Sequence, residues 1–187
     1  MTRYILHGGL STEDNEKNAE FFREVVKGID SPVKILMVYF ARKEYKRKEL
    51  FEIHKRLFLK NNPNVNIEFL YASEYPNEFR AQVNRAQVMF VEGGSSLRLF
   101  ENLKDIPDIK DLIRSVDVYA GSSAGASLVS RYAYPSTGDD VAERLGLVDI
   151  KLINHFDENK MDRFRRLEKM YPEINIYALR EFEYVVL

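Results

Sequence analysis

The most informative segment of the sequence is Val116-Asp117-Val118-Tyr119-Ala120-Gly121-Ser122-Ser123-Ala124-Gly125-Ala126. An apolar run leads into Gly-x-Ser-x-Gly, and small residues that can open a helix follow. This order is typical of a nucleophile elbow, a sharp strand-to-helix turn that exposes a serine hydroxyl above a sheet. It predicts a nucleophile at Ser123 and an oxyanion donor at the amide of Ala124. The alternative is an ordinary Gly/Ser turn or an anion site at a helix start.

Apolar runs like the one before the elbow recur along the chain. They cover residues 4–6, 33–40, 65–70, 87–91, 116–120 and 174–179. Segments with helical spacing lie between them, at residues 11–28, 50–58, 95–103, 109–113, 124–130 and 159–171. Continuous apolar runs are typical of strands that are covered on both faces.

Strands that alternate with crossover helices predict an α/β fold with three layers. The central sheet is expected to be mostly parallel, with helices on both faces. No repeat or linker divides the sequence, so a single domain is expected over residues 1–187. Ligands are then expected at the carboxyl ends of the strands, where the elbow also lies.

Composition excludes several classes of protein. Among 187 residues, 28 Lys and Arg nearly balance 29 Asp and Glu, which argues against nucleic-acid and membrane-surface partners. The chain has no cysteine, so thiol catalysis and disulfides are excluded. No His, Asp or Glu cluster has ligand spacing, so no metal site is predicted. With no long apolar segment, a soluble cytoplasmic protein is expected.

A serine nucleophile needs a base, and the chain offers three histidines. His54 shares an apolar helical stripe and is expected to be partly buried, whereas His7 ends the first strand without distinguishing neighbours. His155 follows an apolar run and stands among polar residues, where a strand end could deliver a base. An acid that orients the imidazole could come from Asp139 or Asp140 in the preceding loop, and spacing alone does not choose between them.

Two other segments have simpler interpretations beside a functional one. Gly93-Gly94 follows an apolar run and precedes a helix start, which suits either a tight turn with a serine cap or a ligand loop. The basic run at residues 42–48 opens a helix and is interpreted as its solvated face.

Four segments, taken in order, resemble the peptidase E family, the aspartyl dipeptidases among the serine peptidases. The matching segments are residues 91–99, 121–126, 145–156 and 177–181. The resemblance implies a fold like that of class I glutamine amidotransferases, related to flavodoxin-like architectures. It implies no cofactor.

Carried over residue by residue, the resemblance implies Ser123 as nucleophile and His155 as base. The amides of Gly94 and Ala124 would form the oxyanion hole. This is the machinery of a peptidase with a small peptide as its substrate.

The resemblance also bears on the acid. The family's acid follows its serine by about the distance from Ser123 to Asp139. Asp139 is therefore favoured over Asp140, and Glu181 is a second candidate.

Some positions depart from the family's pattern. Glu92 replaces the first of three glycines, Ser95 and Ser96 replace Asn-Thr, and Phe182 follows Glu181 where a small residue is usual. The arginine that recognises an acidic substrate side chain corresponds to Lys160, with Arg163 one turn later. Lysine keeps the charge but lacks the bidentate fork of arginine, so a preference for N-terminal aspartate is left open.

The expected function is serine-dependent hydrolysis of short peptides, among them dipeptides with an N-terminal acidic residue. Two alternatives remain: an esterase that shares the elbow, and a silent binding or regulatory domain of the same fold. The sequence leaves the oligomeric state open.

Overall fold

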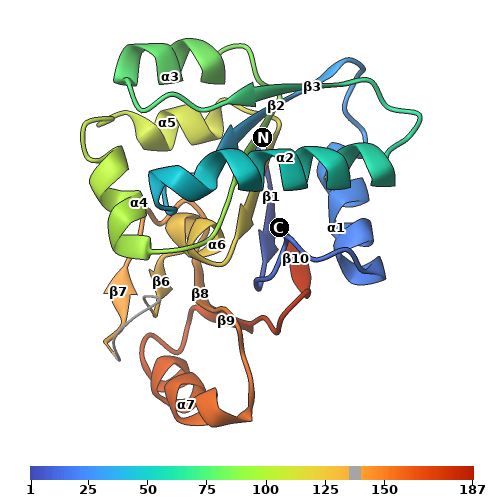
Figure 1. The fold of residues 1–187 in the computed structure, drawn as a ribbon. Coiled ribbons are helices and arrows are strands. Elements are labelled where there is room, and N and C mark those ends of the chain that lie inside the picture. Colours follow the sequence, from blue (N-terminus) through green and yellow to red (C-terminus); the bar gives the residue numbers. More distant parts are fainter. Residues whose placement is uncertain (135–139) are drawn as a thin grey trace.

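The computed structural model describes residues 1–134 and 140–187, which form two sheets and their covering helices (Figure 1). The main sheet has the strand order β10-β1-β5-β4-β2-β3. Its strands are β1 (Arg3–His7), β2 (Val33–Val38), β3 (Ile67–Tyr71), β4 (Val88–Val91), β5 (Val118–Ser122) and β10 (Tyr184–Val186). All pairs in it are parallel except β1 with β10. The α/β prediction is confirmed.

The helices connect these strands. They are α1 (Glu16–Val26), α2 (Glu44–Asn61), α3 (Pro76–Val83), α4 (Ser96–Leu103), α5 (Ile109–Arg114), α6 (Ala124–Val129) and α7 (Met161–Lys169), with the short 3-10 helix η1 (Glu158–Lys160) before α7. Within the described ranges, no helix combines the length and the apolar character that crossing a bilayer requires.

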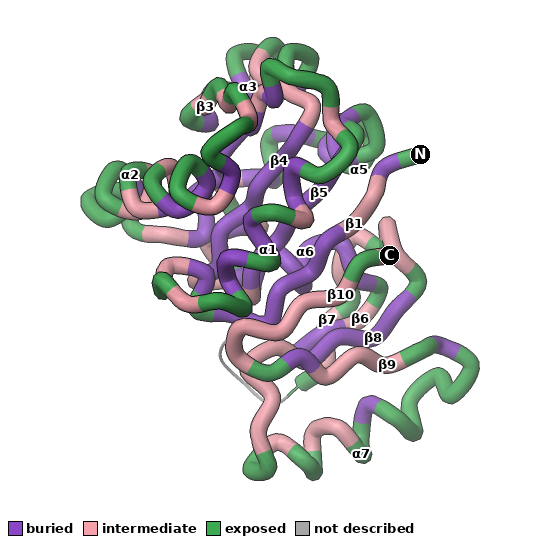
Figure 2. The backbone as a smooth tube through the Cα atoms, turned by 90° about the vertical axis from the view of Figure 1, so that its right-hand side faces the viewer, coloured by how far each residue is buried: buried purple, intermediate pink, exposed green. Residues whose placement is uncertain are grey.

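Alternate residues of each strand enter two separate cores, which gives the three layers. Ile35 and Met37 of β2 pack under α1 and α2, whereas Leu36 and Val38 pack on the opposite face with α3 to α6. The same alternation holds along β1, β4 and β5. Figure 2 shows the buried backbone along β4, β5 and β1, with exposed turns on α2 and α7. Because both faces are covered, these strands are apolar throughout.

A second sheet, β7-β6-β8-β9, adjoins the first and was not predicted. Its strands are β6 (Tyr132–Ala133), β7 (Ala142–Glu143), β8 (Ile150–Ile153) and β9 (Asn175–Ala178). β6 and β7 have two residues each, too few to show a periodic pattern. Helix α7 packs on this sheet through Leu167, which shares a small apolar cluster with Ile153 and Tyr134. The buried Lys151 ammonium donates to carbonyl groups at the end of α7, including that of Met170.

Two details of the sequence prediction are wrong. The helix expected from residue 11 begins at Glu16, where the Asn15 side chain caps it, and the Ser11 hydroxyl donates to Glu92 instead of capping a helix. The basic run is not simply a solvated face, because Arg47 is buried and donates to the Arg42 carbonyl.

The loop after β1 is fixed by His7, which is buried at the end of that strand. Its Nδ1 accepts from the Gly9 amide at 3.2 Å, and its Nε2 lies 2.9 Å from Asn18 Oδ1. The Asn18 amide in turn donates to the Leu10 and Glu13 carbonyl groups. Burial lowers the pKa of His7 from 6.5 to about 4, so the folded protein holds this side chain neutral.

We therefore expect acid to destabilise the fold in a defined window. Between pH 6.5 and about 4 the unfolded chain binds a proton at His7 that the folded chain does not, so stability falls as pH drops through this window. Lowering the pH from 7 to 5 should cost about 2 kcal/mol through this group. Denaturant unfolding at both pH values measures the loss.

His7→Gln removes the titrating group and should reduce the difference between the two pH values. Burial also lowers the pKa of His54, so part of the difference should persist. An unchanged difference in the variant would show that His7 is not responsible.

Candidate active site

The turn between β5 and α6 holds Ser123 in a conformation that few residues other than glycine adopt. Its φ is 50° and its ψ is −108°. The turn fits because its two glycines have no Cβ. A Cβ on Gly125 would overlap the Val91 carbonyl oxygen, and one on Gly121 would overlap the backbone of Gly125. The Tyr119 hydroxyl also donates to the Gly125 carbonyl at 2.6 Å. The Gly-x-Ser-x-Gly spacing therefore follows from the space available between β4, β5 and α6.

His155 meets this serine from the second sheet, just beyond β8. Its Nε2 lies 2.7 Å from Ser123 Oγ. The ring packs so closely on Gly9 that a Cβ there would overlap it, and the His155 amide donates to the Gly8 carbonyl at 3.1 Å. Gly9 thus makes room for the imidazole, and the Gly8 carbonyl fixes the backbone of His155.

An acid completes this chain of hydrogen bonds at Glu181, in the turn between β9 and β10. Glu181 Oε1 lies 2.9 Å from His155 Nδ1. The next residue, Phe182, has a φ of 66°, which explains why a small residue suits this position. Asp140 is exposed and does not line the pocket around Ser123, and Asp139 lies outside the described residues. Within residues 1–134 and 140–187, Glu181, the second candidate from the sequence, is the acid in contact with His155.

Two amides are available beside the serine hydroxyl. Ala124 is the first residue of α6, and Gly94 has a φ of 141° in the loop after β4. A Cβ on the neighbouring Gly93 would lie 2.9 Å from Ser123 Cβ, so this loop runs directly against the nucleophile. Among the described residues, the Gly94 and Ala124 amides donate to no backbone or side-chain acceptor. Both have the free N–H that an oxyanion requires.

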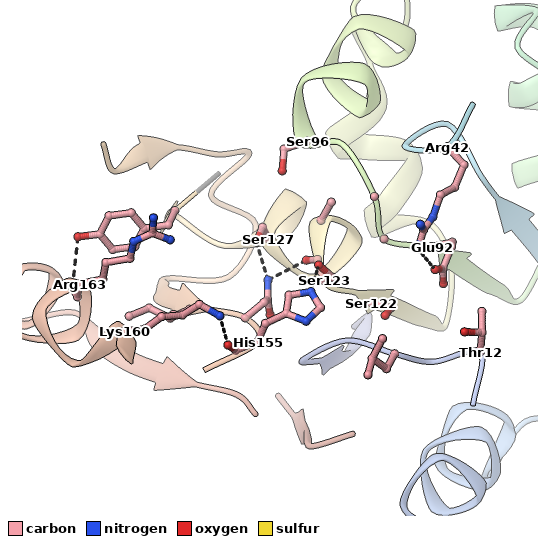
Figure 3. A pocket seen from close by; sticks show the side chains of 17 residues that line it. Thr12, Arg42, Glu92, Ser96, Ser122, Ser123, Ser127, His155, Lys160 and Arg163 are labelled. Carbon is pink, nitrogen blue, oxygen red and sulfur yellow. Dashed lines mark hydrogen bonds and ion pairs between the residues drawn. The ribbon is translucent and has the colours of Figure 1, made fainter. Parts of the chain in front are cut away.

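A pocket of about 360 Å³ surrounds Ser123 and His155. Figure 3 shows Arg42 and Glu92 on one side of Ser123 and Lys160 and Arg163 on the other. Among its described lining residues, three are cationic, and Glu92 is the one carboxylate.

Lys160 and Arg163, the two cations predicted from the sequence, both line this pocket, and both also contact other groups of the protein. The Lys160 ammonium donates to the His155 carbonyl. The Arg163 guanidinium lies over the Tyr134 ring, with its Cζ 5.3 Å from the ring centroid.

Sequence reasoning missed Asn154, which precedes the histidine. Its side-chain amide donates to the Ser123 carbonyl at 2.8 Å and to Ser127 Oγ at 2.7 Å. It therefore holds the strained serine from the second sheet. An asparagine in a loop has many uses, so only its place beside His155 could have drawn attention to it.

Comparisons with known proteins agree with this geometry. The sequence profile of Peptidase family S51 matches residues 5–187. No curated protein sequence matches the chain. Among solved structures, a candidate peptidase E protein from Listeria monocytogenes EGD-e is similar, with a TM-score of 0.69 and 17% identity over 100% of this chain and 94% of the other. A peptidase from an acI-B1 Actinobacterium has a TM-score of 0.65 and 17% identity over 100% of this chain and 83% of the other.

The two structural similarities bear on the fold alone, because both identities are low. The family match is independent of them and covers nearly the whole chain, including the elbow, the histidine and Glu181. The protein therefore belongs to Peptidase family S51, the peptidase E family, and is a serine peptidase.

Proposed function

We propose that the protein hydrolyses dipeptides, with a preference for an N-terminal acidic residue, through Ser123, His155 and Glu181. The observation that carries this proposal is the continuous hydrogen-bonded chain from the serine hydroxyl to the carboxylate, with distances of 2.7 and 2.9 Å. Nucleophile, base and orienting acid in this order are the constellation of serine hydrolases on unrelated folds.

In the acylation step, Ser123 Oγ attacks the scissile carbonyl carbon while His155 Nε2 takes the hydroxyl proton. The negative charge on the carbonyl oxygen is stabilised by the amides of Gly94 and Ala124. Glu181 accepts the hydrogen bond from Nδ1–H, which fixes the tautomer and stabilises the imidazolium. His155 then gives its proton to the leaving amine as the C–N bond breaks. Water hydrolyses the acyl-enzyme by the same steps, with His155 as base.

The pocket supports a short, anionic substrate. Its volume of about 360 Å³ is near the lower end of the range for small-ligand sites. The Arg42–Glu92 ion pair cancels in charge, and Lys160 and Arg163 leave the described lining with a net positive charge. Acidic dipeptides satisfy both conditions.

Ser123→Ala should abolish hydrolysis. Loss of the nucleophile should lower kcat by more than about 10³-fold on every dipeptide of a panel that includes several with N-terminal Asp. Release of free amino acids by the purified enzyme and the variant measures this effect. Turnover that is unchanged in the variant would exclude Ser123 as nucleophile.

The same pair of proteins separates the alternatives. If no dipeptide is cleaved but a fluorophosphonate probe labels Ser123 in the wild type, an ester substrate becomes the better interpretation. If the probe labels neither protein, the domain is catalytically silent.

The identity of the acid is tested by Glu181→Gln against Asp139→Asn. The glutamine keeps the size of Glu181 but removes the charge that stabilises imidazolium, so kcat should fall roughly 10²-fold or more. Asp139→Asn should leave kcat near that of the wild type. The opposite result, with the larger loss in Asp139→Asn, would return the acid role to Asp139.

The cations near His155 should read the acidic side chain. Lys160→Gln and Arg163→Gln should each raise KM for Asp-Leu by roughly tenfold, because a hydrogen bond between charged groups is lost. KM for Ala-Leu should change little. Steady-state kinetics on the two dipeptides gives the comparison, and an equal rise on both would count against a role in selectivity.

A further inference from the structure

Arg42 lines the pocket, although the sequence analysis interpreted the basic run that contains it as a solvated helix face. It lies four residues after the end of β2 and lines the cavity that contains Ser123. Its Nη2 donates to Glu92 Oε1 at 2.8 Å, and 35% of its side chain is exposed. Within the described part of the chain, its Nε is buried and has no hydrogen-bond partner. The buried Nε cannot reach a ligand, but the guanidinium has five N–H donors, and its exposed part keeps donors beyond the one that Glu92 takes.

Glu92 holds Arg42 in this place. Only 2% of its side chain is exposed. Its second carboxylate oxygen accepts from Ser11 Oγ at 2.8 Å and lies 3.3 Å from Nε2 of the buried His54. Both oxygens are occupied, so binding a substrate ammonium here would cost an existing contact. Glu92 acts as a positioning residue, and it stands where the family's pattern has glycine.

The Arg42 side chain lines the same pocket as Ser123 and packs against the loop after β4. A Cβ on Gly94 would be 3.0 Å from Arg42 Cδ, so the arginine stem packs on the loop whose Gly94 amide is the proposed oxyanion donor. Lys160 and Arg163 lie on the far side of Ser123 (Figure 3). Cationic groups therefore flank the nucleophile on both sides.

A dipeptide with N-terminal aspartate has a matching arrangement of charge. Its side-chain carboxylate and its C-terminal carboxylate lie the same number of bonds from the scissile carbonyl carbon, in opposite directions along the chain. Arginine is well suited to such a group, since its planar donors match a carboxylate.

We propose that Arg42, oriented by Glu92, binds the C-terminal carboxylate of the substrate. This inference rests on the proposed dipeptidase function, in which Lys160 and Arg163 face the acidic side chain. A longer peptide or a C-terminal amide has no carboxylate at this position, so Arg42 is the residue that restricts the enzyme to free dipeptides.

The test compares Asp-Leu with its C-terminal amide. The wild type should prefer the free acid, and Arg42→Gln should raise KM for the free acid by roughly tenfold or more while KM for the amide changes little. Lys43→Gln is the matched control, because it removes the same charge from the adjacent, exposed residue outside the Ser123 pocket. It should behave as the wild type does.

Two further variants separate binding from folding. Arg42→Gln leaves a buried carboxylate oxygen unpaired, whereas Arg42→Gln combined with Glu92→Gln removes that charge and should show the same loss of preference. Arg42→Lys keeps the charge without the planar fork and should be intermediate.

An equal rise in KM on acid and amide would overturn the proposal. The proposal would also be overturned if Arg42→Gln lost the preference for Asp-Leu over Asn-Leu but kept the wild-type preference for Asp-Leu over its amide. Arg42 would then recognise the substrate side chain. If the wild type cleaves none of these peptides, the proposed function fails instead. Calorimetric binding of Asp-Leu and its amide to Ser123→Ala, with and without Arg42→Gln, then tests the carboxylate site on its own.

Discussion

The close approach of the β5–α6 turn to strand β4 is the constraint on which the site depends. Gly125 lies against the Val91 carbonyl, where no side chain fits. This contact brings α6 down onto the sheet and forces the positive φ of Ser123. The strain is retained because packing on both sides leaves the turn no alternative. The loop after β4 then runs beside the nucleophile, which sets the positions of Gly94, Glu92 and, through the ion pair, Arg42.

In the proposed mechanism, the groups that activate the serine follow strands of the second sheet. His155 and Glu181 follow β8 and β9, and main-chain hydrogen bonds fasten both turns to the loop after β1. The His155 amide donates to Gly8, and the Phe182 amide donates to Gly9. His7 also fixes that loop, because its imidazole contacts Asn18, whose amide donates to the Leu10 carbonyl. The short loop after β1 thus holds His155 and Glu181 in position, although neither residue belongs to the main sheet.

Local features could be predicted from the sequence. The elbow at Ser123 and the choice of His155 depend on a strand, a tight turn and a short motif, all of which are visible within a few residues. The Glu181–His155 contact joins residues 26 apart, and Arg42–Glu92 joins residues 50 apart, so no local pattern reveals either one. The basic run shows the same limit. Its charges suggested a solvated helix face, whereas burial of Glu92 draws Arg42 into the pocket.

The proposed catalytic residues are divided between two sheets, so the reactivity of the serine depends on the packing of one sheet against the other. Ser123 directly follows β5 of the main sheet, whereas its proposed base and acid lie in turns after β8 and β9 of the smaller sheet, which has two strands of only two residues each. Small units with short strands open at lower free-energy cost than a large central sheet does. Partial opening of this unit would separate the imidazole from a serine that is still in its strained turn. The nucleophile would then be inert in any molecule whose two sheets are not docked, including a chain that is still folding.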